Sequence, residues 1–346
     1  MASANVTYGE AKTNPGARPK WGSALWSNPW PRFLARRLLG AAIALIALVI
    51  VVFLMVRIIP GDPIEKILGT NATPTSVATL RHSLGLDDSL WMQFRHYIAH
   101  LVRGDLGSSI AFASVGGGGT AISTLVRQRI GSSLLLAGSG LALVLFVGVP
   151  LGMLFGSLTR ENRHRRIELM FTGLASVLSS IPDYLSATIL AFIFAVQLRV
   201  LPVDSAGISG LILPALAVAS AATFYFARLT RVETLNVLAQ DYIRTARAKR
   251  LPWRVIMFRH TLPNILTSVL TLSGLIFAQL IGGTILVETV FNRPGLGTTL
   301  VQGVLASDYP VIQAVILLLG LLVICVNLLV DILLGILDPR TLAKSS

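Results

Sequence analysis

The chain has 346 residues, of which 53% are apolar and only 13% are charged. A soluble domain carries about 25% charged residues, and the apolar residues here form long uninterrupted runs, so the composition excludes an ordinary soluble enzyme. The formal net charge of +13 indicates basic loops beside a membrane and contact with membrane lipid, and we expect no nucleic-acid partner. The single cysteine, Cys325, excludes a disulfide framework and a multi-thiolate metal site.

The N-terminal part divides into three segments. Residues 1–31 are polar and predict a cytoplasmic tail, and residues 32–59 predict the first transmembrane helix with its basic flank. The apolar run begins too deep in the chain and is too long for a cleaved signal sequence. Residues 60–129 form a large external region, in which apolar residues recur at helical spacing between Leu80 and Leu101. This pattern predicts two short amphipathic helices separated at Gly85-Leu86.

A glycine-rich loop follows in the external region, with the sequence SVGGGGT at 114–120. No lysine follows the glycines and no strand precedes them, so the segment is not a nucleotide phosphate loop. It is either a solvated linker or a flexible loop that reaches an external partner. The candidates for contact with such an external partner are Gly116, Gly117, Gly118 and Gly119.

Residues 130–342 predict a core domain with five further transmembrane helices, followed by a short tail at 343–346. The run Leu169–Leu198 is interrupted at Ile181-Pro182, and each half is too short to cross a membrane alone. We therefore interpret it as one tilted or kinked helix. The predicted fold is an all-α polytopic membrane protein with six transmembrane helices.

The distribution of charge predicts the orientation of these helices. Most of the 29 Lys and Arg residues lie in the N-terminal tail, between the second and third spans, between the fourth and fifth spans, and at the C-terminus. Positively charged loops stay in the cytoplasm. Both termini and the loop at about 228–263 are therefore expected to be cytoplasmic.

The loop at 228–263 is too polar to cross a membrane and too regular in its apolar spacing to be unstructured. An alanine-rich helical segment, Arg244–Arg250, ends at Leu251-Pro252, and Trp253–His260 begins another helix. Two short helices at an angle would form a protrusion on the cytoplasmic face. Contact with lipid head groups and docking of a soluble motor protein are both compatible with this basic surface.

The same stretch carries a family resemblance. The sequence DYIRTARAKRLP at 241–252, continued by His260, Leu262 and Pro263, resembles the EAA loop of the B-type permease subunits of bacterial dipeptide, oligopeptide and nickel ABC importers. These subunits are binding-protein-dependent transport system inner-membrane components. The resemblance extends over residues of about 32–342, with IPGDP at 59–63 and VETVFNRPGLG at 287–297 in the expected order.

One position departs from the family pattern, because Arg250 stands where the family has glycine. If that glycine adopts a left-handed conformation, arginine would cost about 1 kcal/mol there. Either the local turn differs in this chain, or Arg250 adds a contact to the motor subunit.

The resemblance implies a permease subunit in the bacterial cytoplasmic membrane that forms half of a path for di- or oligopeptides. The implied partners are a second permease subunit in a heterodimer, two cytoplasmic ATP-binding subunits and an external substrate-binding protein. The chain itself is expected to be non-catalytic and to bind no cofactor, with ATP and Mg held by the partner ATPase subunits; it contains no G-x-x-x-x-G-K-[ST] sequence. Nickel, glutathione or haem-like substrates are alternatives, as is a self-sufficient secondary transporter.

The candidate site residues form two groups, and no metal site is expected. The resemblance implies that the ATPase-coupling residues are Asp241, Arg244, Thr245, Ala246, Arg250, Leu251, His260, Leu262 and Pro263. Polar residues inside apolar spans are functional candidates by default, which makes Asp183, Tyr184, Asn327 and Asp331 candidates for the translocation path. For Asp331, an internal hydrogen bond is the alternative. His96 and His100 have a spacing that suits a metal, but no third ligand is evident.

Overall fold

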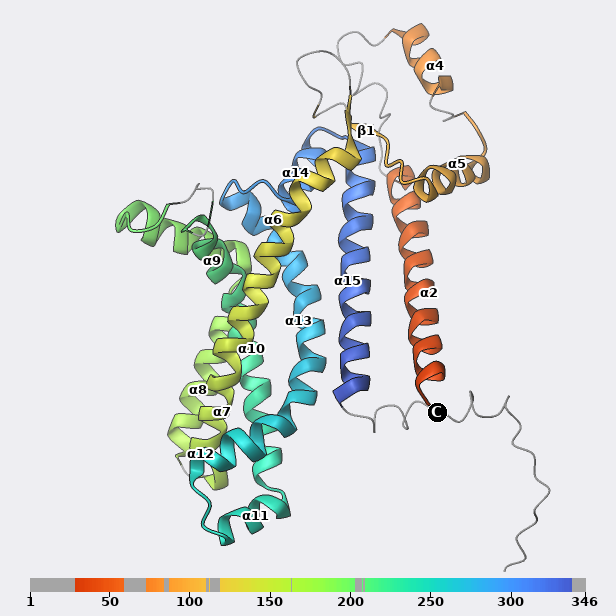
Figure 1. Cartoon of the computed structure of the whole chain (residues 1–346). Coiled ribbons are helices and arrows are strands. Elements are labelled where there is room, and N and C mark those ends of the chain that lie inside the picture. Colours follow the sequence, from red (N-terminus) through yellow and green to blue (C-terminus); the bar gives the residue numbers. More distant parts are fainter. Residues whose placement is uncertain are drawn as a thin grey trace, which may run out of the picture.

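A computed structural model describes residues 29–58, 73–83, 87–109, 112, 119–162, 164–202, 207 and 209–337, which are almost entirely helical (Figure 1). The N-terminal half contains α2 (Pro29–Ile58), α4 (Pro74–Ser83), α5 (Leu90–Val102), β1 (Ser108–Ser109), β2 (Thr120–Ala121), α6 (Ile122–Leu143), the π-helical turn η2 (Val144–Gly148), α7 (Val149–Leu158), η3 (Arg160–Asn162) and α8 (Arg165–Ser179). The C-terminal half contains α9 (Asp183–Leu190), η4 (Ala191–Gln197), α10 (Ser209–Leu238), α11 (Asp241–Ala248), α12 (Trp253–Val255), η5 (Ile256–Thr261), α13 (Leu262–Val290), α14 (Leu296–Leu305) and α15 (Tyr309–Leu337).

Five continuous helical stretches within the described residues are long and apolar enough to span a membrane, and a bent pair makes six. The five are Trp30–Ile58, Ile122–Leu158, Ser209–Leu238, Trp253–Val290 and Tyr309–Ile336. This confirms the predicted all-α polytopic fold. In Figure 1, α2 begins and α15 ends at the end of the molecule where α11 lies, and α4 and α5 lie at the opposite end. We call these the α11 end and the α5 end.

The bent pair consists of α8 and the helix Asp183–Gln197, which meet at 92°. The bend lies at the predicted break, because Pro182 adopts an extended conformation with ψ 144° and has no N–H to continue a helix. The angle is larger than the predicted kink. As a result, α9 runs at a steep angle to the bundle and packs against α10 and α13, while α8 stays aligned with the bundle (Figure 1).

The helix α10 forms the centre of the bundle and packs against α6, α7, α8, α9 and α13. Its crossing with α7 is very close, because a Cβ atom at Gly152 would overlap Thr230 and one at Gly156 would overlap Thr234. Small residues four apart let two membrane helices approach closely. These two helices are therefore packed backbone to backbone over the last turns before the α11 end.

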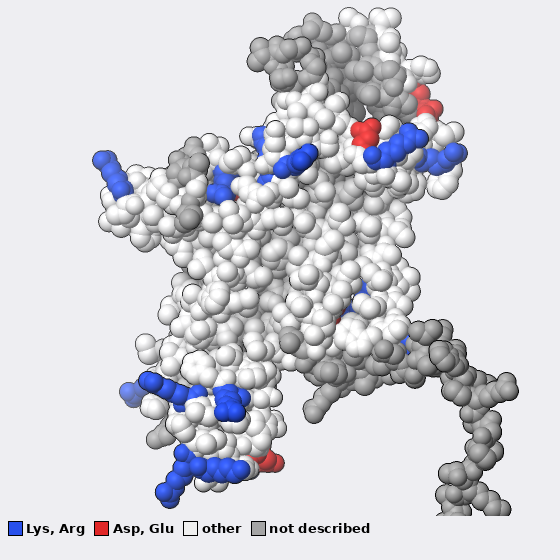
Figure 2. Space-filling model, viewed as in Figure 1, with Lys and Arg blue, Asp and Glu red and all other residues white. Residues whose placement is uncertain are grey.

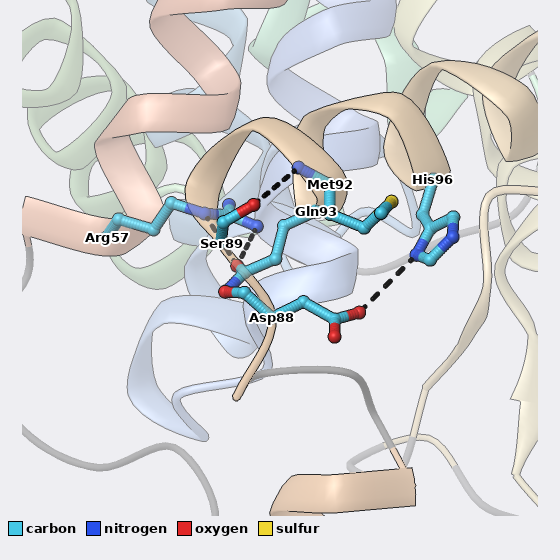
Figure 3. Close-up of polar contacts among 6 residues, drawn as sticks. All are labelled: Arg57, Asp88, Ser89, Met92, Gln93 and His96. Atoms are coloured by element: carbon cyan, nitrogen blue, oxygen red, sulfur yellow. Dashed lines mark hydrogen bonds and ion pairs between the residues drawn. The ribbon is translucent and has the colours of Figure 1, made fainter.

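The helix α5 packs against the C-terminal end of α2. The predicted pair of amphipathic helices is present as α4 and α5, and residues 84–86 between them lie outside the described part. Phe53 of α2 makes edge contact with Phe94 of α5 at a centroid distance of 5.0 Å. Figure 3 shows Arg57 beside Gln93, whose Oε1 accepts hydrogen bonds from Nη2 at 2.9 Å and from Nε at 3.2 Å.

The visible charged side chains lie mainly in two bands, one near each end of the molecule, with an almost uncharged zone between them (Figure 2). Lys and Arg are more abundant than Asp and Glu in both bands. This arrangement is expected of helices whose middle portions lie in hydrocarbon.

Candidate functional site: the helix α11 and the start of α13

The helix α11 presents one buried face and one exposed face. Ile243 and Ala246 pack inward and are buried, whereas Asp241, Arg244 and Thr245 are exposed. The spacing of three between the buried residues places them on one side of the helix. The outer side of α11 therefore carries polar and charged side chains. Ala246, by contrast, packs in the core of the chain itself.

The C-terminal end of α11 forms a Schellman motif. The N–H of Arg250 donates to the carbonyl of Arg247 at 2.8 Å, and the N–H of Leu251 donates to the carbonyl of Ala246 at 3.3 Å. This pattern places the residue at position 250 in a left-handed conformation, and Arg250 has φ 57°. Arg250 therefore occupies a left-handed conformation of the kind that glycine favours, and a contact of Arg250 with the motor subunit stays a prediction.

Two arginines connect the neighbourhood of α11 to the turn between α7 and α8. Arg231 of α10 is buried, donates from Nε to Thr159 Oγ1 at 3.0 Å and pairs through Nη2 with Glu168 Oε1 of α8 at 2.7 Å. Arg247 of α11 lies 3.9 Å from Glu161 Oε1, and its guanidinium lies 5.8 Å from the ring centre of Trp253. Arg247 therefore joins α11 to the turn after α7, and Arg231 joins α10 to Thr159 and to α8.

The remaining predicted coupling residues lie where α13 begins. Pro252 opens α12, the π-helical turn η5 follows, and α13 starts at Leu262. His260 is half-buried and its carbonyl accepts a hydrogen bond from Asn264 Nδ2 at 2.6 Å, while Pro263 is exposed. Leu262 packs against the main core. The structure thus gathers the nine predicted residues around α11 and the adjoining start of α13.

The structure does not bring the four path candidates together. Asp183 and Tyr184 begin α9, and a Cβ atom at Gly283 of α13 would overlap the Asp183 carboxylate. Asn327 and Asp331 lie on α15, where Asp331 Oδ2 pairs with Arg37 Nη1 of α2 at 3.0 Å. Asp331 therefore faces α2, whereas the Oδ1 atom of Asn327 lies beside Gly274 of α13.

The four glycines of the external loop fall largely outside the described residues. Gly116, Gly117 and Gly118 are not described, and Gly119 lies beside the short pairing of β1 with β2. The position of the loop relative to any partner stays a prediction.

A buried carboxylate at the α5 end was not among the predicted site residues. Glu288 is fully buried, accepts a hydrogen bond from Ser133 Oγ at 2.6 Å and accepts another from the N–H of Gly297 at 2.7 Å. It thereby caps the first turn of α14, whose orphan N–H groups favour a negative charge. The fragment VETVFNRPGLG contains Glu288 together with Gly295 and Gly297, at which a Cβ atom would overlap the Glu288 carboxylate. The spacing of seven and nine residues between this glutamate and the two glycines was the signal available in the sequence.

The external histidines pair with carboxylates. His96 lies 3.9 Å from Asp88 Oδ2, as Figure 3 shows, and His100 lies 2.9 Å from Asp105 Oδ2. Hydrogen bonds from the N–H of Gly107 and then from His100 hold the pKa of the Asp105 carboxyl below its usual value. Within the described part of the chain, no three His, Cys, Asp or Glu side chains are arranged to hold a metal ion.

Comparison with known families agrees with this architecture. Residues 148–343 match the family described as "Binding-protein-dependent transport system inner membrane component", and residues 31–116 match the N-terminal domain of such membrane components. The chain belongs to this family. As a member, it is the permease component of an ABC importer and a multi-pass protein of the inner membrane.

Relatives cover nearly the whole permease. A probable peptide ABC transporter permease protein of Sinorhizobium fredii is 35% identical over 318 residues, which are 89% of this chain and 98% of the relative. A putative peptide transport system permease protein of Brucella suis is 36% identical with the same coverage. The glutathione transport system permease protein GsiC of Salmonella typhimurium is 37% identical over 308 residues, which are 89% of this chain and 97% of that protein.

A solved structure shares the fold of this permease. It is titled as an inward-facing conformation of the MetNI methionine ABC transporter, and it aligns with a TM-score of 0.53 at 18% identity. The alignment covers 62% of this chain and 97% of the solved chain.

Proposed function

We propose that this permease forms half of a translocation path for di- or oligopeptides and that α11 docks into a cytoplasmic ATPase subunit. The observation that carries the docking proposal is the two-sided character of α11, with Ile243 and Ala246 buried in the chain and its outer face polar and exposed. A helix of this kind, held at the end of α10 and joined to α13, suits the transfer of force from a soluble partner to the membrane helices.

The proposed complex contains a second, different permease subunit, two ATP-binding subunits and an external substrate-binding protein. ATP and Mg are held by the ATPase subunits, and this chain contributes no catalytic group and no cofactor site. Closure of the ATPase pair displaces α11, and the ties from Arg247 to Glu161 and from Arg231 to Glu168 carry the displacement into α7, α8 and α10.

Peptides are the proposed substrate because the relatives from Sinorhizobium fredii and Brucella suis are named as peptide transporters. Glutathione is the second candidate, favoured by the relative from Salmonella typhimurium. Glutathione is itself a short peptide, so both candidates require a path that accepts amide groups and terminal charges.

The first experiment is an affinity purification of the tagged chain from native membranes in mild detergent. We expect recovery of a second permease and of one or two ATPases, and the external protein that co-purifies provides the substrate test by its affinity for dipeptides against glutathione. Recovery of the chain alone, together with gradient-driven uptake in proteoliposomes, would overturn the proposal.

The second experiment tests α11 directly by adding bulk to its outer face. Thr245→Trp projects from an exposed position, so the chain should still insert and assemble its core. We expect at least a tenfold fall in substrate-stimulated ATP hydrolysis by the reconstituted complex. Arg165→Trp, at an exposed position on α8, is the matched control and should retain stimulation. Normal stimulation in Thr245→Trp would contradict docking through this face.

A further inference from the structure

An apolar groove of about 320 Å³ lies between α7 and the segment Trp253–Leu262, which contains α12, η5 and the start of α13. Both walls belong to membrane spans, because the span Ile122–Leu158 ends at one wall and the span Trp253–Val290 begins at the other. Among the described residues that line the groove, only Ser157 and Arg254 carry a hydroxyl or a charged group. The groove therefore lies at the edge of the membrane-spanning region, toward the α11 end (Figure 1).

The two walls share an irregular backbone. In each wall a π-helical turn ends two residues before a proline, since η2 precedes Pro150 and η5 precedes Pro263. Proline has no N–H group and interrupts the hydrogen-bond ladder of a helix, and π turns are frequent at functional sites. The groove lies beside these two irregular turns.

Both walls change from polar to apolar in the same direction. On α7, Ser157 lies near the end of its span, and Val149 lies about 12 Å deeper at 1.5 Å per residue. The other wall runs the opposite way, so Arg254 lies at the start of its span and Leu262 lies deeper. The polar ends of the two walls therefore lie at the same membrane boundary.

This boundary end of the groove suits an anionic group. Arg254 is exposed, and none of the described residues forms an ion pair or a hydrogen bond with its side chain. Trp253 is 42% exposed beside it, as is typical of tryptophan at a membrane–water interface. Within the described part of the chain, no acidic side chain lines the groove, so the guanidinium keeps its charge for a phosphate.

The deeper part of the groove suits a hydrocarbon chain. Leu154 of α7 is 51% exposed and Phe258 of η5 is 67% exposed, so large apolar side chains remain uncovered on both walls. Between them lie Met153 and Met257, whose flexible side chains adapt to irregular apolar shapes. An acyl chain can therefore follow the groove from the boundary toward the membrane centre.

We propose that this groove binds one anionic phospholipid of the cytoplasmic leaflet, with its phosphate against Arg254 and one acyl chain between Leu154 and Phe258. Basic sites between helices on the cytoplasmic side suit anionic head groups. A lipid is favoured over a protein partner because the groove has the polarity of a lipid, with one cation at the boundary and apolar side chains beyond it. Inorganic phosphate cannot use the apolar part.

The test uses the full chain with its co-purifying subunits, delipidated in mild detergent. Dioleoylphosphatidylglycerol should bind, as measured by native mass spectrometry, and should raise the unfolding temperature because it joins α7 to α12 and α13. Dioleoylphosphatidylcholine and inorganic phosphate should do neither at the same concentration. Equal binding of phosphatidylcholine would overturn the proposal.

The first variant removes the charge at the boundary. Arg254→Gln should weaken phosphatidylglycerol binding about fivefold, which is the effect of one arginine at a membrane surface. Arg166→Gln is the matched control, because Arg166 is exposed at the start of α8 and does not line the groove. Unchanged binding in Arg254→Gln, or an equal loss in both variants, would contradict the assignment of the phosphate to Arg254.

The second variant fills the entrance of the groove from the α7 wall. Ser157 is half-buried, and its hydroxyl donates to the carbonyl of Leu154 in the same helix at 2.7 Å, so Ser157→Phe removes no bond between helices. It should abolish phosphatidylglycerol binding while the chain remains folded. Gly173→Phe, at an exposed position of α8 with open surroundings, is the control and should bind normally. Unchanged binding in Ser157→Phe would place the lipid elsewhere.

A cross-linking experiment in intact membranes distinguishes a lipid from a protein partner. A photoreactive phenylalanine analogue takes the place of Phe258, which is exposed and lines the groove. Irradiation should yield an adduct with the mass of a phospholipid. A cross-link to the second permease in its place would overturn the proposal and assign the groove to an interface of the complex.

Discussion

At the scale of single residues, Arg250 occupies a backbone conformation that strongly favours glycine. Its φ of 57° brings Cβ close to the following carbonyl, which costs roughly 1 kcal/mol. The turn keeps this geometry because the two hydrogen bonds of the Schellman motif and Pro252 fix the end of α11. The side chain of Arg250 is exposed, and its contact with a motor subunit stays a prediction.

We therefore expect Arg250→Gly to stabilise the folded chain by about 1 kcal/mol, because it relieves the left-handed strain. Thermal unfolding of the detergent-solubilised protein measures the effect. Lys249→Gly is the control, since Lys249 has an ordinary φ of −74° and glycine there should destabilise instead. If both variants shift stability in the same direction, strain at position 250 is not the cause.

At the scale of elements, the contact of α7 with α10 depends on Gly152 and Gly156. Gly152→Ala should destabilise the protein by about 1–3 kcal/mol, because the added methyl group would overlap Thr230 and the backbone of Ala227. Unfolding in increasing denaturant measures the loss. Gly138→Ala, at an exposed position of α6 with open surroundings, should be neutral or stabilising. Equal stability of Gly152→Ala and the original protein would show that the two helices are not closely packed.

The elements also show how far the sequence alone could lead. The length of the apolar runs predicted the membrane helices, and Pro182 predicted the position of the bend, because both are local properties. The bend angle of 92° depends on what α9 packs against, and the burial of Glu288 depends on α14 folding back over it. The spacing of Gly148, Gly152 and Gly156 was readable as a helix-contact motif, but its partner helix was not.

At the scale of the whole molecule, the α11 end and the α5 end should lie on opposite sides of the membrane, with α11 in the cytoplasm. After replacement of Cys325, single cysteines are introduced at the exposed positions Arg103, beside α5, and Lys249, beside α11. In cells with a permeable outer envelope, a membrane-impermeant maleimide should label Arg103→Cys directly and Lys249→Cys only after the inner membrane is opened. The reverse pattern would invert the orientation deduced from the basic loops.

The long helix α10 has one further mechanical consequence. It contains Pro214 near its start, where the missing N–H weakens the helix, and it continues without another proline to Leu238. The segment from Pro214 to Leu238 is about 36 Å long at 1.5 Å per residue. If α10 bends at this proline, a rotation of about 10° there would move the Leu238 end by about 6 Å. A displacement of the Leu238 end of α10 by about one helical turn therefore requires only a small rotation at Pro214.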